Sequence, residues 1–451
     1  SAEAYAEWLL STPLSKAQIE ILASELTVGE TYFFREIRSF EILGERVLPE
    51  LIRTRQDSDR RLRIWSAGCC TGEEAYSIAI LLDRILPSPH HWHVTILATD
   101  INPRFLQKAA EGVYGEWSFR NPPAWLKGHY FKPVGGHRYE ILPRIKKMVT
   151  FSSLNLAEDV YPSLSNNTNA MDLVFCRNVL MYFAPDLVRK VIHNFHRSLV
   201  DGGHLVVSPT EASNQLFLQF VPLRFEGITL YGKSGKQPPA PPNLFPALET
   251  LALLPTQDYF PIPTPPSPAL SRSPSGETAA QPAVTLPTVF QEALALFEQG
   301  DYLDAATKLN IGLKREAQPE DSALMARICA NLGQLTEAQT WAEKAIAANK
   351  LNAGLYYLRA VILQEQNALD ESAASLKQAL YLDPDFVLAH YALGNLALRQ
   401  HRPEESTRHF SNVLVLLNRY GADDVLPQSD GLAAGRLREM VQSTMSMEAT
   451  A

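Results

Sequence analysis

Fourteen prolines fall within the 50 residues from Pro238 to Pro287, and this segment divides the 451-residue chain into two unlike halves. Proline fixes φ and lacks the backbone donor that helices and interior strands need, so the segment can form neither. It indicates an extended linker, which we place at residues 234–287. Such a linker predicts that the second half is free to hold a partner while the first half works at a distance. The alternative is that the second half covers a functional site of the first. A proline-rich ligand for a peptide-binding domain is the alternative interpretation.

After the linker, a sequence pattern recurs every 34 residues. Equivalent places in three copies hold Ala345, Ala379 and Val413, and a weaker copy at 304–313 is displaced by 33. This period, with two helices per copy, resembles the tetratricopeptide repeat, in about four copies over residues 289–420. We therefore expect an all-α repeat domain at 288–421 that binds an unknown protein partner, and a partly disordered tail at 422–451. A helical bundle with accidental spacing is the alternative.

Before the linker, short β-rich runs alternate with helices. This alternation predicts a parallel, doubly wound, Rossmann-like α/β sheet over residues 58–233. Residues 1–57 show helical spacing instead and predict a helical N-terminal subdomain. The expected strands are 62–66, 94–99, 149–151, 173–176 and 205–209, and the helices between them include 73–86 and 185–199.

Composition excludes several classes of protein. No run approaches the ~18 consecutive apolar residues of a membrane span, so membrane insertion is not expected. The net charge of −8 argues against nucleic acid as the main partner. The four cysteines (Cys69, Cys70, Cys176 and Cys329) have neither a disulfide pattern nor zinc-ligand spacing. We therefore expect a reducing, cytoplasmic compartment and no metal site.

The first predicted strand runs into a short loop, Ala67–Glu74, and then into a helix. A strand, a small-residue turn and a helix N-terminus can hold a nucleoside cofactor against the backbone. The loop has only two glycines, Gly68 and Gly72, and matches neither the dinucleotide nor the phosphate-loop pattern. It therefore suits a nucleoside without pyrophosphate, such as S-adenosylmethionine. A plain strand–turn–helix connection explains the same residues.

The second predicted strand ends at Asp100. An acidic residue at this place commonly holds the hydroxyl groups of a ribose. The alternative is that Asp100 or Asn102 caps the next helix.

Four segments together resemble the CheR family, the S-adenosylmethionine-dependent methyltransferases of bacterial chemoreceptors. The segments are Gly29–Arg35, Gly72–Glu74, Phe151–Leu156 and Asp172–Phe183. The resemblance covers residues 1 to about 233, and the repeats match a variant architecture with a tetratricopeptide tail. It implies methylation of glutamate side chains on a receptor cytoplasmic domain, with S-adenosylhomocysteine as the product. A catalytically degenerate scaffold that senses S-adenosylmethionine is the alternative.

The resemblance also implies individual roles. Arg35 and Tyr182 are the expected catalytic residues, nearest the transferring methyl group. Glu73 and Asp100 are expected to hold the amino group and the ribose of the cofactor. Many members have an asparagine two residues before the threonine, where this chain has Gly29, so that side-chain contact is absent or supplied otherwise. The expected cofactor-binding residues are Thr31, Arg35, Glu73, Asp100, Asn155, Leu156, Arg177 and Asn178.

These residue types suit a carboxylate acceptor. A glutamate is already anionic at pH 7, so methyl transfer needs alignment and desolvation rather than a general base. Arg35 can hold a carboxylate with two hydrogen bonds, and Tyr182 can orient the methyl group or the acceptor. Without the resemblance, Arg35 as a helix cap and Tyr182 as a core residue are the alternatives.

Residues 101–150 carry nine Lys/Arg against three Asp/Glu. Short strands around Gly135 and Gly136 predict an antiparallel subdomain at about 115–147. In the family, such a subdomain helps to dock the receptor, and basic side chains there favour glutamate-rich helices. A solvated surface is the alternative.

Overall fold

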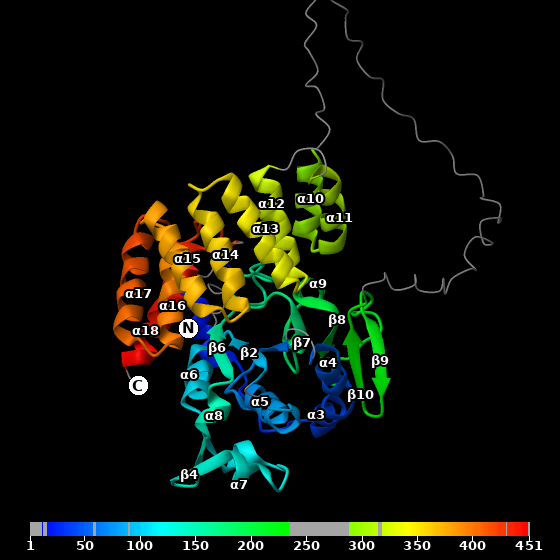
Figure 1. The fold of residues 1–451 in the computed structure, drawn as a ribbon. Coiled ribbons are helices and arrows are strands. Elements are labelled where there is room, and N and C mark those ends of the chain that lie inside the picture. The colour runs from blue at the N-terminus through cyan, green and yellow to red at the C-terminus, as the bar shows by residue number, and fades with distance from the viewer. Residues whose placement is uncertain are drawn as a thin grey trace, which may run out of the picture.

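The computed structural model describes residues 11, 16–56, 60–88, 91–234, 288–313, 318–429 and 431–449. The predicted linker therefore lies outside the described residues, except for Ser234, and so do residues 1–10 of the predicted N-terminal subdomain. Figure 1 shows an α/β domain formed by the first half and an arc of helices formed by the second.

A seven-stranded sheet forms the centre of the α/β domain, in the spatial order β6–β2–β1–β7–β8–β10–β9. Neighbours from β6 to β8 run parallel, as predicted, whereas β10 is antiparallel to both β8 and β9. The prediction missed the β9–β10 hairpin, because β9 is a short edge strand that contains Pro222. The bounds are β1 Arg61–Ala67, β2 His93–Asp100, β6 Val149–Ser153, β7 Met171–Phe175, β8 Leu199–Val206, β9 Val221–Phe225 and β10 Ile228–Gly232.

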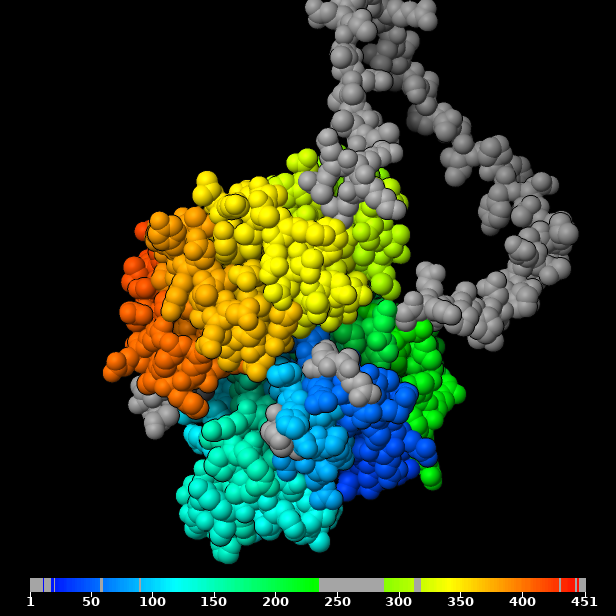
Figure 2. Space-filling view, in the orientation of Figure 1, coloured from blue at the N-terminus to red at the C-terminus, as the bar shows by residue number. Residues whose placement is uncertain are grey.

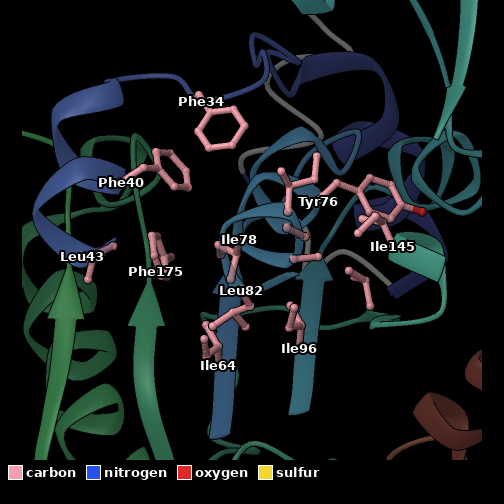
Figure 3. Close-up of a cluster of buried hydrophobic side chains, with 14 of the residues drawn as sticks. Phe34, Phe40, Leu43, Ile64, Tyr76, Ile78, Leu82, Ile96, Ile145 and Phe175 are labelled. Atoms are coloured by element: carbon pink, nitrogen blue, oxygen red, sulfur yellow. The ribbon is translucent and has the colours of Figure 1, made fainter. Parts of the chain in front are cut away.

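Both faces of the sheet are buried. Successive side chains of a strand point to opposite faces, so Ile64 and Trp65 of β1 belong to two different hydrophobic clusters. On one face, Ile64 packs beneath helix α5 (Glu73–Ile85), as Figure 3 shows. On the other face, Trp65 packs against Phe195 of helix α9 (Pro185–Ser198). Because helices cover both faces of the sheet, every residue of β1 is buried.

The N-terminal helices pack onto the same sheet. Helix α3 (Ile37–Ile42) continues through a π-helical turn (Leu43–Val47) into α4 (Leu48–Arg55). Figure 3 shows Phe40 and Leu43 of this segment beside Phe175 of β7. The segment therefore shares the core of the α/β domain. Helix α2 (Lys16–Leu26) precedes it, and α6 (Pro103–Glu111) follows β2.

A second, three-stranded antiparallel sheet lies within residues 113–141, close to the predicted subdomain. Its order is β3–β5–β4, and Figure 1 shows β4 and α7 at the end of the molecule farthest from the repeat helices. The elements are β3 Val113–Gly115, β4 Phe131–Gly135, β5 Arg138–Ile141, α7 Leu126–Tyr130 and α8 Pro143–Lys146.

The second half forms four helix pairs, which confirms the predicted repeats. Ala345, Ala379 and Val413, the residues that recur every 34 positions, are completely buried, and Ala379 and Val413 belong to one hydrophobic cluster. The pairs are α10 Val289–Gln299 with α11 Tyr302–Leu313, α12 Pro319–Asn331 with α13 Leu335–Ala348, α14 Ala353–Glu365 with α15 Leu369–Leu382, and α16 Val387–Arg399 with α17 Pro403–Leu417.

The chain after the repeats differs from the predicted partly disordered tail. Residues Ala434–Ala449 form helix α18, which packs against α17. Leu437 and Val441, one helical turn apart, are fully buried in the repeat cluster, so this helix extends the core of the repeat domain. Among the described residues, no helix is both long and apolar enough to cross a bilayer.

The two halves are not held apart. Figure 2 shows the repeat domain lying directly on the α/β domain, and Glu365 of α14 forms ion pairs with Arg61 and Arg63 of β1. The predicted separation is therefore wrong for this structure. The length of a connecting segment does not tell whether the surfaces that it joins attract one another.

Candidate functional site

A cavity of about 310 Å³ lies where strands β1, β2, β6 and β7 end, within the size range of small-molecule sites. The carboxyl ends of parallel strands meet here, on either side of β1, where the strand order reverses. The segment before α3 forms the remaining wall. The predicted residues that line the cavity are Thr31, Arg35, Asp100, Asn155, Leu156, Arg177, Asn178 and Tyr182, which leaves out only Glu73.

Two glycines shape the loop between β1 and α5. Gly68 and Gly72 adopt φ values of +83° and +92°, a conformation that other residues rarely adopt. A Cβ atom on Gly68 would lie 2.5 Å from Val179, and one on Gly72 would lie 2.8 Å from Ala109. The loop therefore needs glycine at both positions, for its turn and for close packing.

Asp100 lies at the end of β2 and faces the cavity. Its carboxylate accepts hydrogen bonds from the backbone N–H groups of Cys70 (2.8 Å) and Asn102 (2.9 Å). Burial raises the pKa of Asp100, although these hydrogen bonds oppose the shift. The cap of α6 is Asn102, which accepts from the N–H groups of Arg104 and Phe105. Asp100 thus holds the loop against β2 and does not cap that helix.

Arg177, just after β7, is the cation at the centre of the site. Its guanidinium donates to Glu74 (3.2 Å), to Glu36 (2.9 Å) and to the carbonyl of Arg35 (2.5 Å). Its Nε atom is buried and has no hydrogen-bond partner among the described residues. Arg177 therefore ties the N-terminal segment to α5 and leaves one buried donor beside the cavity.

Glu73 and Glu74 point in different directions. The Glu73 carboxylate accepts from Thr71 (2.6 Å) and Ser118 (2.8 Å), outside the residues that line the cavity. Glu74 lines the cavity and accepts from Ser66 (2.7 Å). Burial raises the pKa of Glu74, while Arg177 and the Ser66 hydrogen bond lower it. The geometry differs from our expectation that Glu73 holds the cofactor and favours Glu74.

Arg35 and Tyr182 lie on the open side of the cavity. The Arg35 guanidinium donates to the carbonyl of Glu30 (2.6 Å), and Tyr182 is 64% exposed. An exposed phenol is not the core residue of the alternative interpretation. The two side chains, from segments 147 residues apart in sequence, line the same cavity.

Glu211 is a residue that sequence reasoning missed. It lies after β8, is 9% exposed, and accepts from the backbone N–H groups of Asn178 and Val179, both at 2.7 Å. It therefore fixes the loop that carries Arg177 and Tyr182. The signal was available: Glu211, like Asp100, is an acidic residue that closely follows a buried parallel strand.

Several residues around the cavity adopt strained backbone conformations. Phe34, Glu36, Cys70 and Asn178 all have φ between +50° and +59°, which is unfavourable for residues with a side chain. Such conformations persist only where the surrounding contacts enforce them, and they concentrate at functional sites. Hydrogen bonds from Cys70 to Asp100 and from Asn178 to Glu211 provide that enforcement here.

Gly29 does not line the cavity. A Cβ atom at this position would lie 2.7 Å from the ring of Phe105, which does line it. An asparagine side chain therefore does not fit unless the ring of Phe105 moves, and that ring occupies the space instead.

The residues around the cavity fit S-adenosylmethionine, which carries a sulfonium, an amino group, a carboxylate and a ribose. Carboxylates of Glu74 and Asp100 suit its positive and hydroxyl groups. The unpaired buried Nε of Arg177 suits its carboxylate. Leu154 and Leu156 supply an apolar wall of the kind that a purine ring packs against.

Replacing Asp100 with alanine should weaken binding of S-adenosylmethionine by about 1.5–3 kcal/mol, the range for a hydrogen bond to a charged group. The Cys70 turn also loses its acceptor, which adds to the loss. Calorimetry with the full chain measures the effect. Asp186→Ala, which removes a fully exposed carboxylate at the start of α9, is the control. Unchanged affinity in the Asp100 variant would contradict this placement of the cofactor.

The doubly wound sheet, with a nucleoside-sized cavity at its switch point, defines the class of α/β domains to which S-adenosylmethionine-dependent methyltransferases belong. Residues 29–223 match the family model described as "CheR methyltransferase, SAM binding domain", and residues 362–400 match a TPR repeat model. The chain belongs to the CheR methyltransferase family and uses S-adenosylmethionine as its cofactor.

Curated relatives agree. "Chemotaxis protein methyltransferase 2" of Vibrio cholerae is 35% identical over 222 residues, which are 49% of this chain and 75% of that protein. "Chemotaxis protein methyltransferase 1" of Pseudomonas aeruginosa is 37% identical over 202 residues, 44% of this chain and 71% of that protein. Among solved structures, "MamA 41-end from Desulfovibrio magneticus RS-1" is 26% identical over 29% of this chain and 75% of that chain, with a TM-score of 0.28.

Proposed function

We propose that this protein transfers the methyl group of S-adenosylmethionine to glutamate side chains on the cytoplasmic domain of a chemoreceptor-like signalling protein, giving γ-methyl esters and S-adenosylhomocysteine. The observation that carries the proposal is that Arg35 and Tyr182 both line the cofactor cavity, with Tyr182 largely exposed. A scaffold that only senses the cofactor would not need this pair. The family supports a methyltransferase, and its relatives' names support a role in chemotaxis.

The chemistry of the cavity supports a carboxylate acceptor. No histidine is among the described residues that line it, and the carboxylates of Asp100, Glu74 and Glu30 already accept hydrogen bonds from this chain. An acceptor that must lose a proton would need a free base there, whereas a glutamate carboxylate is already ionised. When bound, the cofactor supplies an electrophilic methyl group. Arg35 then aligns the acceptor carboxylate, and Tyr182 limits its orientation and excludes water.

The cofactor contacts in this proposal follow the positions of the side chains. Asp100 holds the ribose, Asn155 and Leu156 flank the adenine, and Glu74, in place of Glu73, holds the amino group. Arg177 and Asn178 line the methionine end, with Thr31 beside Arg35. The domain limits that we propose are 1–57, 58–233 and 288–421, with α18 added to the repeat domain.

Methyl transfer to the receptor tests the proposal directly. Full-length protein, tritiated S-adenosylmethionine and candidate receptor cytoplasmic domains should give labelled receptor whose label is released as methanol by mild base, as expected of an ester. Tyr182→Phe should reduce the rate while binding of the cofactor stays intact. Cofactor binding without transfer to any receptor would favour the degenerate scaffold, and base-stable label would exclude a glutamate ester.

A further inference from the structure

The repeat domain is joined to the methyltransferase domain by a buried ionic cluster. Glu365, the last residue of α14, has a side chain that is only 4% exposed and forms ion pairs with Arg61 (3.4 Å) and Arg63 (3.6 Å). Asn169 donates to the other carboxylate oxygen at 3.0 Å. A buried carboxylate is stable only when it is paired and hydrogen-bonded, so this contact requires the docked arrangement.

The contact extends over all four repeats. The first helix of every pair borders the methyltransferase domain: Leu294 of α10, Arg327 of α12, Glu365 of α14 and Leu388 of α16 line the gaps between the two domains or form ion pairs across them. Stacked helix pairs normally offer such an extended surface to a protein partner. In this chain the methyltransferase domain occupies that surface.

Packing at the turns of the repeats is equally close. A Cβ atom on Gly300, between α10 and α11, would collide with Arg197, and one on Gly333, between α12 and α13, would lie 3.3 Å from Arg61. Leu164 of the methyltransferase domain is buried within the hydrophobic cluster of the repeats. The two surfaces therefore meet closely at these points, although cavities of about 830 and 300 Å³ remain between them elsewhere.

The docked surface reaches the back of the cofactor cavity. Arg436 of α18 donates to the hydroxyl of Ser153 at 2.9 Å, and Ser153 is the last residue of β6. The next residues, Leu154 and Asn155, line the cofactor cavity on one side and the gap against α16 and α18 on the other. The repeat domain thus lies directly behind the predicted adenine wall.

The open side of the cavity is left clear. All of its lining residues, among those that the structure describes, come from positions 26–183, and none comes from the repeats. The docked repeats therefore do not block the cavity. Instead, the repeat domain contacts residues 153–155, which form or adjoin the wall of the cavity on the side of β6.

We propose that the surface formed by the first helices of the repeats (α10, α12, α14 and α16) binds the methyltransferase domain of the same chain. Glu365 holds this docked arrangement, and Arg436 of α18 then positions the Ser153–Leu156 wall for S-adenosylmethionine. Arg436 is a positioning residue, because it acts through Ser153, the residue that it holds. Glu365 pairs with Arg61 and Arg63 and acts on the wall only by keeping the two domains docked. A foreign protein segment that binds the same surface must displace the domain and lowers cofactor affinity. The inference rests on the cavity being the cofactor site.

Glu365→Arg in the full chain tests the docking. The new cation faces Arg61 and Arg63, so the domains should separate, which small-angle scattering reports as a larger radius of gyration. The dissociation constant for S-adenosylmethionine should rise about 2- to 30-fold, the range for mutations that alter coupling between sites. Hydrogen exchange should speed up in residues 153–170. Glu371→Arg, an exposed carboxylate on α15, is the matched control and should change none of these.

Arg436→Ala removes the hydrogen bond to Ser153 without reversing a charge. It tests the proposal independently if the Glu365 variant does not fold. It should raise the KM for S-adenosylmethionine and leave kcat unchanged, whereas general destabilisation lowers the active fraction and therefore kcat. Ser153→Ala should raise the KM for S-adenosylmethionine to a similar degree. The double variant should have a KM no higher than that of either single variant, because both changes remove the same hydrogen bond.

The outcomes are distinct. If the wild-type chain does not bind S-adenosylmethionine, the cavity assignment fails, and this inference fails with it. If the wild-type chain binds but separated domains keep normal affinity and exchange rates, the proposed function stands and this inference is overturned. An unchanged radius of gyration in Glu365→Arg, or an unchanged KM in Arg436→Ala, also overturns it.

Discussion

Replacing Arg35 with alanine should lower turnover about 10²- to 10³-fold, the loss typical of removing one well-placed donor from a catalytic site. The affinity for S-adenosylmethionine should stay within about threefold, because the proposed guanidinium contact to the acceptor carboxylate matters mainly in the transition state. Steady-state methyl transfer at saturating receptor measures the first quantity, and calorimetry measures the second.

Arg38→Ala is the matched control for this variant. Arg38 lies three residues further along, is exposed, and pairs with Glu41 on the surface, where an ion pair contributes little. The control should keep normal turnover. A raised dissociation constant with near-normal turnover in Arg35→Ala would make Arg35 a cofactor-binding residue and remove its catalytic role.

Replacing Arg177 with alanine should lower the free energy of unfolding by about 3–5 kcal/mol, the usual cost of removing one member of a buried ion pair. Its side chain is 2% exposed and pairs with both Glu36 and Glu74, so the change leaves two carboxylates without their cation. Urea denaturation of the full chain measures the effect through the transition of the methyltransferase domain.

The pH dependence of this loss of stability tests whether the unpaired carboxylates cause it. Burial already raises the folded-state pKa of Glu74 above its unfolded value, and loss of Arg177 removes an opposing influence. A carboxyl whose folded pKa is raised loses stability as pH rises through that range. The deficit of Arg177→Ala should therefore be larger near pH 8 than near pH 5, and adding Glu74→Gln should recover part of it. A deficit that is the same at both pH values would point to lost packing instead.

Much of the candidate site was predictable because strand order governs it. Asp100 ends one parallel strand, Asn155 and Arg177 follow two others, and such positions meet at one edge of a sheet. The choice between Glu73 and Glu74 was not predictable from the motif. Adjacent residues of a helix project about 100° apart, and only the position of Ser118, from a distant segment, shows which one turns away.

The docking of the repeats was missed for a different reason. The linker gives no indication of the docking, but β1 does, because Arg61 and Arg63 alternate within a strand that is buried throughout. Buried arginines need partners. Within its own domain, Arg63 donates hydrogen bonds to Asn167 and Asn169. Its carboxylate partner, Glu365, lies about 300 positions away in the sequence. The composition of β1 predicts that some partner exists, and only the fold identifies it.

The place of Leu164 has a consequence for how the chain acquires its structure. This residue belongs to the methyltransferase domain, yet it completes the hydrophobic cluster of the repeats. Synthesis runs from the N-terminus, and domains generally fold in that order. The surface that carries Leu164, Arg61 and Arg63 is therefore finished before the first repeat helix leaves the ribosome. Each helix pair then has a template on which to assemble, so the order of the two domains along the gene favours their docked arrangement.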